Sequence, residues 1–351
     1  MLAPRLVDGD ARGIGQIVRA AVGQHRDAHG AGDVWVRHDL VGQAGRFRAE
    51  QQHIAGRLRR TPVLRTEIGT VNGAVEVALK LEFTQLGGSF KVRGSLNATL
   101  HAQEQGLLTE AGVLVASGGN AAIGAAHAAR IVGVPCTVVV PEAAPRVKVA
   151  ALRDLGAQVH LAGDRYQVAA EVATSMADES GALLLHAYDL PDIVAGAGTI
   201  APELAADVEG PLTIVTCVGG GGLIAGLTTG MRSGDRIVGA EPVGASCLHQ
   251  ALAADHRIPA ELDSIAADSL GATEVGEICW NTVAGRDDVS SIVVTDDDIV
   301  AARAALWHDH RLLVEHGTAA ALAAVTTGQV TTGADSTICV VLCGANTPLS
   351  T

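Results

Sequence analysis

The chain has 351 residues, of which 48% are hydrophobic and 2% aromatic, so it can bury a sizeable core built from aliphatic side chains. Its net charge of −13 argues against nucleic acid or an anionic membrane surface as the main partner. None of the six cysteines belongs to a Cys-x-x-Cys pair, and no charged-then-apolar secretory segment begins the chain. Together these features predict reduced thiols and a cytoplasmic protein.

Residues 1–45 differ from the rest of the chain, because they contain no lysine and show only weak hydrophobic periodicity. We interpret them as an N-terminal extension that is poorly ordered. The regular pattern begins at residue 46 with a predicted helix that leads to Thr61 and Pro62. Predicted strands follow, the second over residues 75–83, and then a glycine-containing loop and a helix that starts at Phe90.

From residue 113 to residue 343, β-rich runs alternate with helical segments, of which residues 192–208 are predicted as a single helix. This alternation predicts an α/β protein with two open, twisted, mainly parallel sheets that have helices on both faces. We assign residues 46–111 and 189–351 to a large domain and residues 112–188 to a small domain.

Two uncharged segments, residues 111–129 and 212–231, are long enough to cross a bilayer. Both contain several glycines near their middle, which indicates a strand, a loop and a helix instead. We therefore predict no membrane role.

Lysine is rare in this sequence, because only Lys80, Lys91 and Lys148 occur among 25 basic residues. A desolvated lysine can lose its proton and act as a base or form a Schiff base, which an arginine cannot do. Lys91, in the segment GGSFKVRGSLNATL, is therefore a candidate for chemistry, and a surface lysine spared by chance is the alternative. We expect Lys80, on a predicted strand, to tolerate replacement by arginine.

The segment VGGGGLIAG, residues 218–226, places four glycines between a predicted strand and the start of a helix. Such a turn brings backbone N–H groups and a helix N-terminus toward an anion, so we favour a phosphate site over a plain tight turn. A dinucleotide-binding interpretation, with Glu241 as the ribose-binding acid, keeps an NAD(P)-binding oxidoreductase as an alternative of another class. The spacing after the second glycine departs from the usual dinucleotide fingerprint.

Two further segments also place a glycine-containing turn directly after a predicted strand. In ASGGNAAIG, residues 116–124, Ser117 and Asn120 either bind a small carboxylate or cap the following helix. In LCGANT, residues 342–347, Cys343 ends the last predicted strand at the sheet edge where ligands collect, unless it is an inert buried thiol. Together with Lys91, these three glycine-containing segments supply a phosphate loop, a carboxylate loop and a neutral group at a strand end.

In these segments the chain resembles the fold-type-II pyridoxal-phosphate enzymes, which have the tryptophan synthase β-like fold. It resembles most closely their threonine/serine dehydratases, which are relatives of the serine racemases. The segments GGSFKVRGSLNA, SGGN, VPEAAPRVKVAALRDLGAQV, AGAGTIAPEL, VGGGGLIAG and VLCGAN occur in the family's order, and the likeness covers about residues 46–349. It implies pyridoxal 5'-phosphate as the cofactor, bound by the large domain, an amino acid as the small-molecule partner, and a homodimer or homotetramer.

The resemblance also implies roles for individual residues, with Lys91 as the Schiff-base lysine. The implied cofactor-binding residues are Phe90, Lys91, Asn120, Gly219, Gly220, Gly221, Gly222 and Cys343. The implied substrate-binding residues are Ser117, Gly118, Gly119, Asn120 and Ala121. In this assignment Asn120 binds the ring hydroxyl, the four consecutive glycines bind the phosphate, and Cys343 faces the pyridine nitrogen.

The implied reaction is β-elimination from a β-hydroxy-α-amino acid such as L-threonine or L-serine. Lys91, a base whose pKa is lowered by burial, takes the α-proton, the β-hydroxyl leaves, and a 2-keto acid and ammonia form. A thiol opposite the pyridine nitrogen, with an ordinary pKa of about 8.5, cannot fix a proton there as a carboxylate would. The ring is then a weaker electron sink, which suits elimination.

Three positions depart from the family pattern. Serine racemases carry a serine where this chain has Gly118, which favours a dehydratase over an amino-acid racemase. Ala121 replaces a usual histidine, which widens the pocket and keeps a phenylserine dehydratase as an alternative. A 3-hydroxyaspartate dehydratase is another alternative, weakened because the loop has no arginine for a second carboxylate. The family's cation positions correspond to Glu241, Ala245 and Cys247, and we expect no metal because a thiol is a poor ligand for Mg²⁺ or Ca²⁺.

Overall fold

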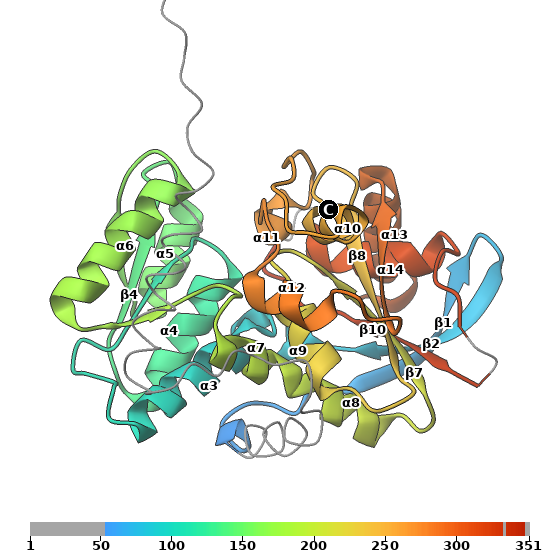
Figure 1. Cartoon of the computed structure of the whole chain (residues 1–351), viewed down its shortest axis with the longest axis horizontal. Coiled ribbons are helices and arrows are strands. Elements are labelled where there is room, and N and C mark those ends of the chain that lie inside the picture. The colour runs from blue at the N-terminus through green and yellow to red at the C-terminus, as the bar shows by residue number, and fades with distance from the viewer. Residues whose placement is uncertain (1–52, 333–334, 348–351) are drawn as a thin grey trace, which may run out of the picture.

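The structure of the protein is a computed structural model that describes residues 53–332 and 335–347 (Figure 1). The predicted extension over residues 1–45 and residues 46–52 of the predicted helix before Thr61 lie outside these residues. The described chain forms two sheets side by side, one at the left and one at the right of Figure 1, and both carry helices. The prediction of an α/β protein with two mainly parallel sheets is therefore confirmed.

The larger sheet has six strands in the order β1-β2-β10-β7-β8-β9. Its strands are β1 (Val63–Thr70), β2 (Gly73–Lys80), β7 (Leu212–Cys217), β8 (Arg236–Pro242), β9 (Val289–Val294) and β10 (Thr337–Val341). The edge strand β1 is antiparallel to β2, and all other neighbours are parallel. The central strand β7 is buried along its whole length, as expected where helices cover both faces of a parallel sheet.

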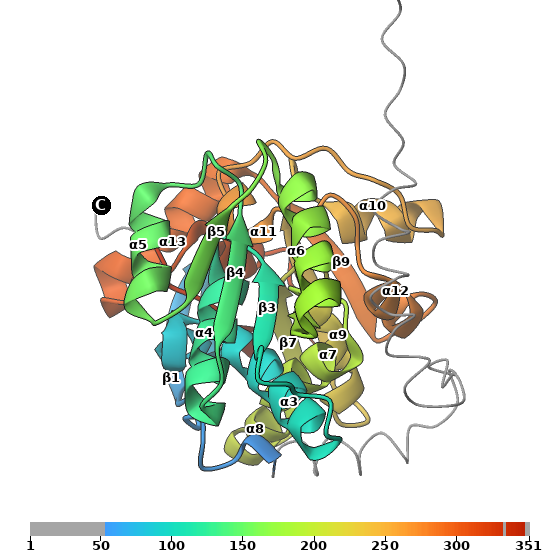
Figure 2. The same ribbon diagram turned by 90° about the vertical axis from the view of Figure 1, so that its left-hand side faces the viewer.

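The smaller sheet has four parallel strands in the order β5-β4-β3-β6. Its strands are β3 (Val113–Ala116), β4 (Cys136–Val140), β5 (Gln158–Leu161) and β6 (Leu183–Leu185). Successive residues of β3 face opposite sides, so Val113 packs toward α4 (Asn120–Val132) and Leu114 toward α6 (Tyr166–Ser180). α5 (Arg146–Asp154) contacts β5, and Figure 2 shows this sheet between its helices.

The remaining α-helices pack around the larger sheet and between the two sheets. They are α3 (Lys91–Glu104), α7 (Pro191–Gly198), α8 (Ile200–Asp207), α9 (Gly222–Gly230), α10 (Cys247–Ala254), α11 (Ala267–Leu270), α12 (Glu277–Val283), α13 (Asp296–His310) and α14 (His316–Thr326). α7 joins the two cores, because Ile193 packs with the smaller sheet's cluster and Val194 with the larger one's. A Cβ at Gly94 of α3 would come within 2.6 Å of the Ile193 carbonyl oxygen, so this close contact requires glycine.

A buried ionic cluster fixes the first turn of α3. Arg93 pairs with Glu82 at 2.8 Å and with Glu203 at 2.7 Å, and Lys80 donates to Glu203 at 2.6 Å. Lys80 is fully buried and also donates to the carbonyl oxygen of Thr61 at 2.8 Å. The expectation that Lys80 tolerates arginine is therefore revised, because a second guanidinium would have to fit beside Arg93 in a closed space.

Two features differ from the predicted pattern. The single helix predicted over residues 192–208 is two helices, α7 and α8, that meet at Thr199. Pro202 explains the break, because it offers no N–H to the carbonyl of Gly198 and its ring crowds that carbonyl. Strand β9 and the helices α10, α11 and α12 were not predicted, since none of them shows a clear hydrophobic period.

Candidate active site

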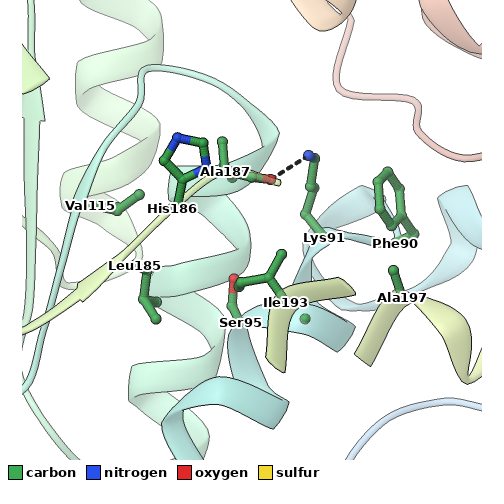
Figure 3. A pocket seen from close by; sticks show the side chains of 11 residues that line it. Phe90, Lys91, Ser95, Val115, Leu185, His186, Ala187, Ile193 and Ala197 are labelled. Atoms are coloured by element: carbon green, nitrogen blue, oxygen red, sulfur yellow. Dashed lines mark hydrogen bonds between the residues drawn. The ribbon is translucent and has the colours of Figure 1, made fainter. Parts of the chain in front are cut away.

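Lys91 lies at the start of α3 and points into a narrow pocket lined by side chains of α3, α7 and the smaller sheet (Figure 3). Its Nζ donates a hydrogen bond to the carbonyl oxygen of Ala187 at 2.7 Å and lies 5.0 Å from the centre of the Phe90 ring. Burial lowers the pKa of Lys91, and the nearby Cys343 is the first of the groups that oppose this shift. A lowered pKa leaves more free amine, the form that a base or a nucleophile requires.

The glycine segment 219–222 connects β7 to α9. Among the described residues, no acceptor receives the backbone N–H groups of Gly219, Gly220 and Gly221. Gly221 has a φ of 89°, which side chains disfavour, and a Cβ at Gly220 would overlap the ring of Tyr188. Free N–H groups beside a helix N-terminus suit an anion, so this loop fits the phosphate of the predicted cofactor.

The second predicted loop, residues 117–121, connects β3 to α4. Ser117 Oγ accepts the N–H of Gly119 at 3.2 Å, and no side chain caps the N-terminus of α4. The alternative that Ser117 or Asn120 caps this helix is therefore wrong. Ala121 lines the same pocket as Lys91, so the loop reaches the amine as a carboxylate-binding loop requires.

Glu315 lies just before α14 and was not predicted as a site residue. Its carboxylate accepts hydrogen bonds from Asn120 Nδ2 at 2.9 and 3.1 Å, and Asn346 Nδ2 donates to Asn120 Oδ1 at 2.7 Å. Burial raises the pKa of Glu315 above its ordinary value, and the Asn120 hydrogen bond opposes this shift. Both ends of the Asn120 amide are thus held by side chains from distant parts of the chain.

Cys343 follows β10, and its Sγ lies 3.2 Å from Cys217 Sγ and 3.1 Å from Thr318 Oγ1. The contact with Cys343, together with burial, raises the pKa of Cys217 well above that of an ordinary thiol. All six cysteines of the chain are buried free thiols. The Cys217 thiol is therefore neutral. The strand ends beside Lys91 carry sulfur and hydroxyl groups, and no carboxylate of the described residues is hydrogen-bonded to Cys343.

His186 lines the Lys91 pocket and contacts Tyr188, and neither residue was predicted. His186 Nδ1 accepts the N–H of Asp189 at 2.9 Å, and its ring meets Tyr188 edge-on with ring centres 4.6 Å apart. Burial lowers the pKa of His186, so the ring is neutral and carries its proton on Nε2. Because Tyr188 also lies against Gly220, it connects the Lys91 pocket to the glycine loop.

The predicted cation positions are engaged in other contacts. Glu241 accepts the backbone N–H groups of Leu248 and His249, each at 2.8 Å, and Cys247 Sγ donates to the carbonyl oxygen of Gly219 at 3.2 Å. Glu241 is fully buried and therefore not accessible to a ribose, which argues against the dinucleotide-binding alternative. Within residues 53–332 and 335–347, no group of three His, Cys, Asp or Glu side chains is placed to hold a metal ion.

The same described residues include no helix that is both long and apolar enough to cross a membrane.

Comparisons with known proteins show which family the chain is similar to. An L-threonine ammonia-lyase of Geobacter sulfurreducens is 35% identical over 299 residues, which cover 84% of this chain and 73% of that protein. The structure of maize serine racemase has a TM-score of 0.79 and 29% identity, and the match covers 87% of this chain and 94% of that one. A threonine deaminase isoform 2 of Solanum lycopersicum has a TM-score of 0.78 and 26% identity, over 90% of this chain and 86% of that one. The model of the family described as "Pyridoxal-phosphate dependent enzyme" matches residues 54–344, and the protein belongs to this family.

Proposed function

We propose that this protein is a pyridoxal-phosphate-dependent ammonia-lyase that converts a β-hydroxy-α-amino acid, L-threonine or L-serine, into a 2-keto acid and ammonia. The observation that carries the proposal is the Lys91 amine, whose pKa is lowered by burial, in one pocket with Ala121 of the predicted substrate loop. The similarity to an L-threonine ammonia-lyase supports the same reaction class.

The cofactor would be held by groups that the chain already provides. Gly219 to Gly222 offer N–H groups for its phosphate, Lys91 offers an amine for its aldehyde carbon, and Cys343 offers a thiol for its ring nitrogen. When bound, pyridoxal phosphate withdraws electrons from the α-carbon of an amino acid and so makes its α-hydrogen acidic. A division into a large and a small domain is part of this proposal, supported by the separate sheet of residues 113–185.

Different residues of the chain bind the substrate and remove its α-proton. The N–H groups and side chains of residues 117–121 bind the α-carboxylate, which leaves the α-carbon beside Lys91. The neutral Nζ of Lys91 takes the α-proton, and the β-hydroxyl leaves as water. Hydrolysis afterwards consumes one water, so threonine yields a 2-keto acid and ammonia without net gain or loss of water. A cytoplasmic location and a homo-oligomeric state stay predictions.

A keto-acid release assay tests this function with four substrates: L-threonine, L-serine, phenylserine and 3-hydroxyaspartate. We expect activity on threonine or serine, and weak activity on 3-hydroxyaspartate because residues 117–121 contain no arginine for a second carboxylate. The purified protein should also show the visible absorbance of pyridoxal linked to a lysine, which borohydride removes. Hydride transfer with NAD(P) and no such absorbance would instead support the oxidoreductase alternative.

A further inference from the structure

The back of the glycine loop is held by a thiol. Cys247, the first residue of α10, is almost completely buried, and its Sγ donates a hydrogen bond to the carbonyl oxygen of Gly219 at 3.2 Å. The carbonyl of Gly219 and the N–H of Gly220 belong to one planar peptide unit and point in opposite directions. A donor that holds this oxygen therefore also fixes the direction of the Gly220 N–H.

The next peptide unit of the loop is held in the same way, but by backbone. The N–H of Gly276 donates to the carbonyl oxygen of Gly220 at 3.0 Å, which fixes the direction of the Gly221 N–H. The N–H groups of Gly220 and Gly221 have no acceptor among the described residues, so they stay free for a ligand. Of the two peptide units, only the Gly219–Gly220 unit depends on a side chain for its orientation.

The position of Cys247 is set in turn by Glu241, at the end of β8. The Glu241 carboxylate accepts the N–H groups of Leu248 and His249 at 2.8 Å each and the hydroxyl of Ser291 at 3.1 Å. Ser246, the N-cap residue of α10, makes no side-chain capping bond. A distant carboxylate thus replaces the usual local cap and fixes the first turn of α10, which carries Cys247.

We propose that Cys247 and Glu241 are positioning residues that orient the phosphate-binding N–H groups, and that they do so without a divalent cation. Both carboxylate oxygens of Glu241 already have donors, and a thiol is a poor ligand for Mg²⁺ or Ca²⁺. The affinity for pyridoxal phosphate therefore depends on the thiol donor and is independent of these cations. This inference rests on the proposed cofactor site.

The experiment measures the dissociation constant of pyridoxal phosphate from the apoprotein by visible absorbance, for wild type and variants. Cys247→Ala removes the donor, and we expect the dissociation constant to rise about five- to tenfold, the usual effect of one lost hydrogen bond. Cys247→Ser keeps a donor and should recover most of the affinity. Cys136→Ala is the matched control, because Cys136 is also buried but lies in the smaller sheet, away from the glycine loop.

Two further measurements keep the inference testable if Cys247→Ala folds poorly. Glu241→Gln places an amide against the N–H groups of α10 and should weaken cofactor binding, and by less in the Cys247→Ala background because both act on one contact. Chelation of divalent cations should leave the wild-type constant unchanged. The inference is overturned if Cys247→Ala binds like Cys136→Ala, or if Mg²⁺ restores affinity lost on chelation. A wild-type protein that does not bind pyridoxal phosphate would contradict the proposed function instead.

Discussion

At the scale of single residues, the amine of Lys91 is the group on which turnover should depend. Lys91→Ala removes the base, and Lys91→Arg replaces it with a guanidinium that stays charged and cannot link to the cofactor. We expect either change to lower keto-acid release by more than about 100-fold, the range of a lost general base. The overall fold should persist, because the Lys91 side chain contributes one hydrogen bond, to Ala187.

The matched control is Lys148→Arg. Lys148 pairs with Asp268 at the surface, and an arginine keeps both the charge and the reach of that pair. Keto-acid release by this variant should stay within about twofold of wild type. Near-normal turnover by Lys91→Arg would show that another residue is the base.

Glu315 should make the apoprotein less stable as pH rises. Because burial raises the pKa of Glu315, the folded protein holds this proton at pH values where the unfolded chain has released it. The stabilisation is complete below the ordinary carboxyl pKa and is lost as pH rises through the raised value. Glu315→Gln removes this loss, so its gain in free energy of unfolding over wild type should be larger at about pH 8 than at about pH 5.

Urea unfolding of both apoproteins at the two pH values measures this difference. The change with pH is the informative quantity, since the new amide alters hydrogen bonds to Asn120 equally at both values. An identical difference at the two pH values would mean that the carboxyl group keeps an ordinary pKa.

Single residues also show where sequence reasoning stops. Lys91, Ser117 and Cys343 could be proposed as site residues from the sequence because each lies in a short segment with its own local pattern. Glu315 could not, because its partner Asn120 is far away in the chain and an isolated acid beside an apolar helix has no pattern. The ion pair of Lys80 was not predicted for the same reason, since only the fold brings it to Glu203.

At the scale of elements, the loop between β3 and α4 should decide between elimination and racemisation. Gly118 does not have a left-handed φ, and a Cβ there would come no closer than 3.7 Å to Val140 Cγ1. A serine can therefore be placed at this position without strain. We expect Gly118→Ser to form measurable D-serine from L-serine, because the new hydroxyl supplies a proton from a second side of the site.

Chiral chromatography of the reaction mixture measures D-serine from wild type and variants. Gly118→Ala is the control that adds bulk without a proton donor, and it should form none. Gly220→Ala should behave differently from both, because its Cβ would overlap the ring of Tyr188, and it should lose cofactor absorbance. Appreciable D-serine from the wild-type protein would place it with the racemases.

The helices and strands that could be predicted from the sequence are those with a clear hydrophobic pattern. α4, α6 and the buried strand β7 have clear patterns, and they lie within residues 113–343, where the sequence predicts alternating strands and helices. The break between α7 and α8 depends on one proline, and β9 contains two serines that interrupt its apolar run. Short or interrupted elements of this kind are decided by packing, which the sequence does not display.

At the scale of the whole molecule, a few polar contacts hold the smaller sheet against the larger one. Asn120 of α4 contacts Glu315 beside α14, and Lys148 of α5 pairs with Asp268 of α11. Alternating strands and helices predicted two sheets, but these contacts depend on how the sheets are placed in space. The Asp268 backbone lies beside the predicted substrate loop, because its carbonyl oxygen would be 3.9 Å from a Cβ placed on Gly119.

The Lys148–Asp268 pair should therefore affect substrate binding more than chemistry. Lys148→Ala removes the pair, and because the pair is exposed we expect KM for the amino acid to rise by no more than about fivefold, with kcat nearly unchanged. Salt screens such pairs, so the effect should be clear at about 0.01 M salt and nearly absent at about 1 M. Asp268→Asn should reproduce it, and the double variant should be no worse than either single one. A fall in kcat that persists in high salt would mean that Lys148 supports the catalytic geometry by packing, since packing is not screened by salt.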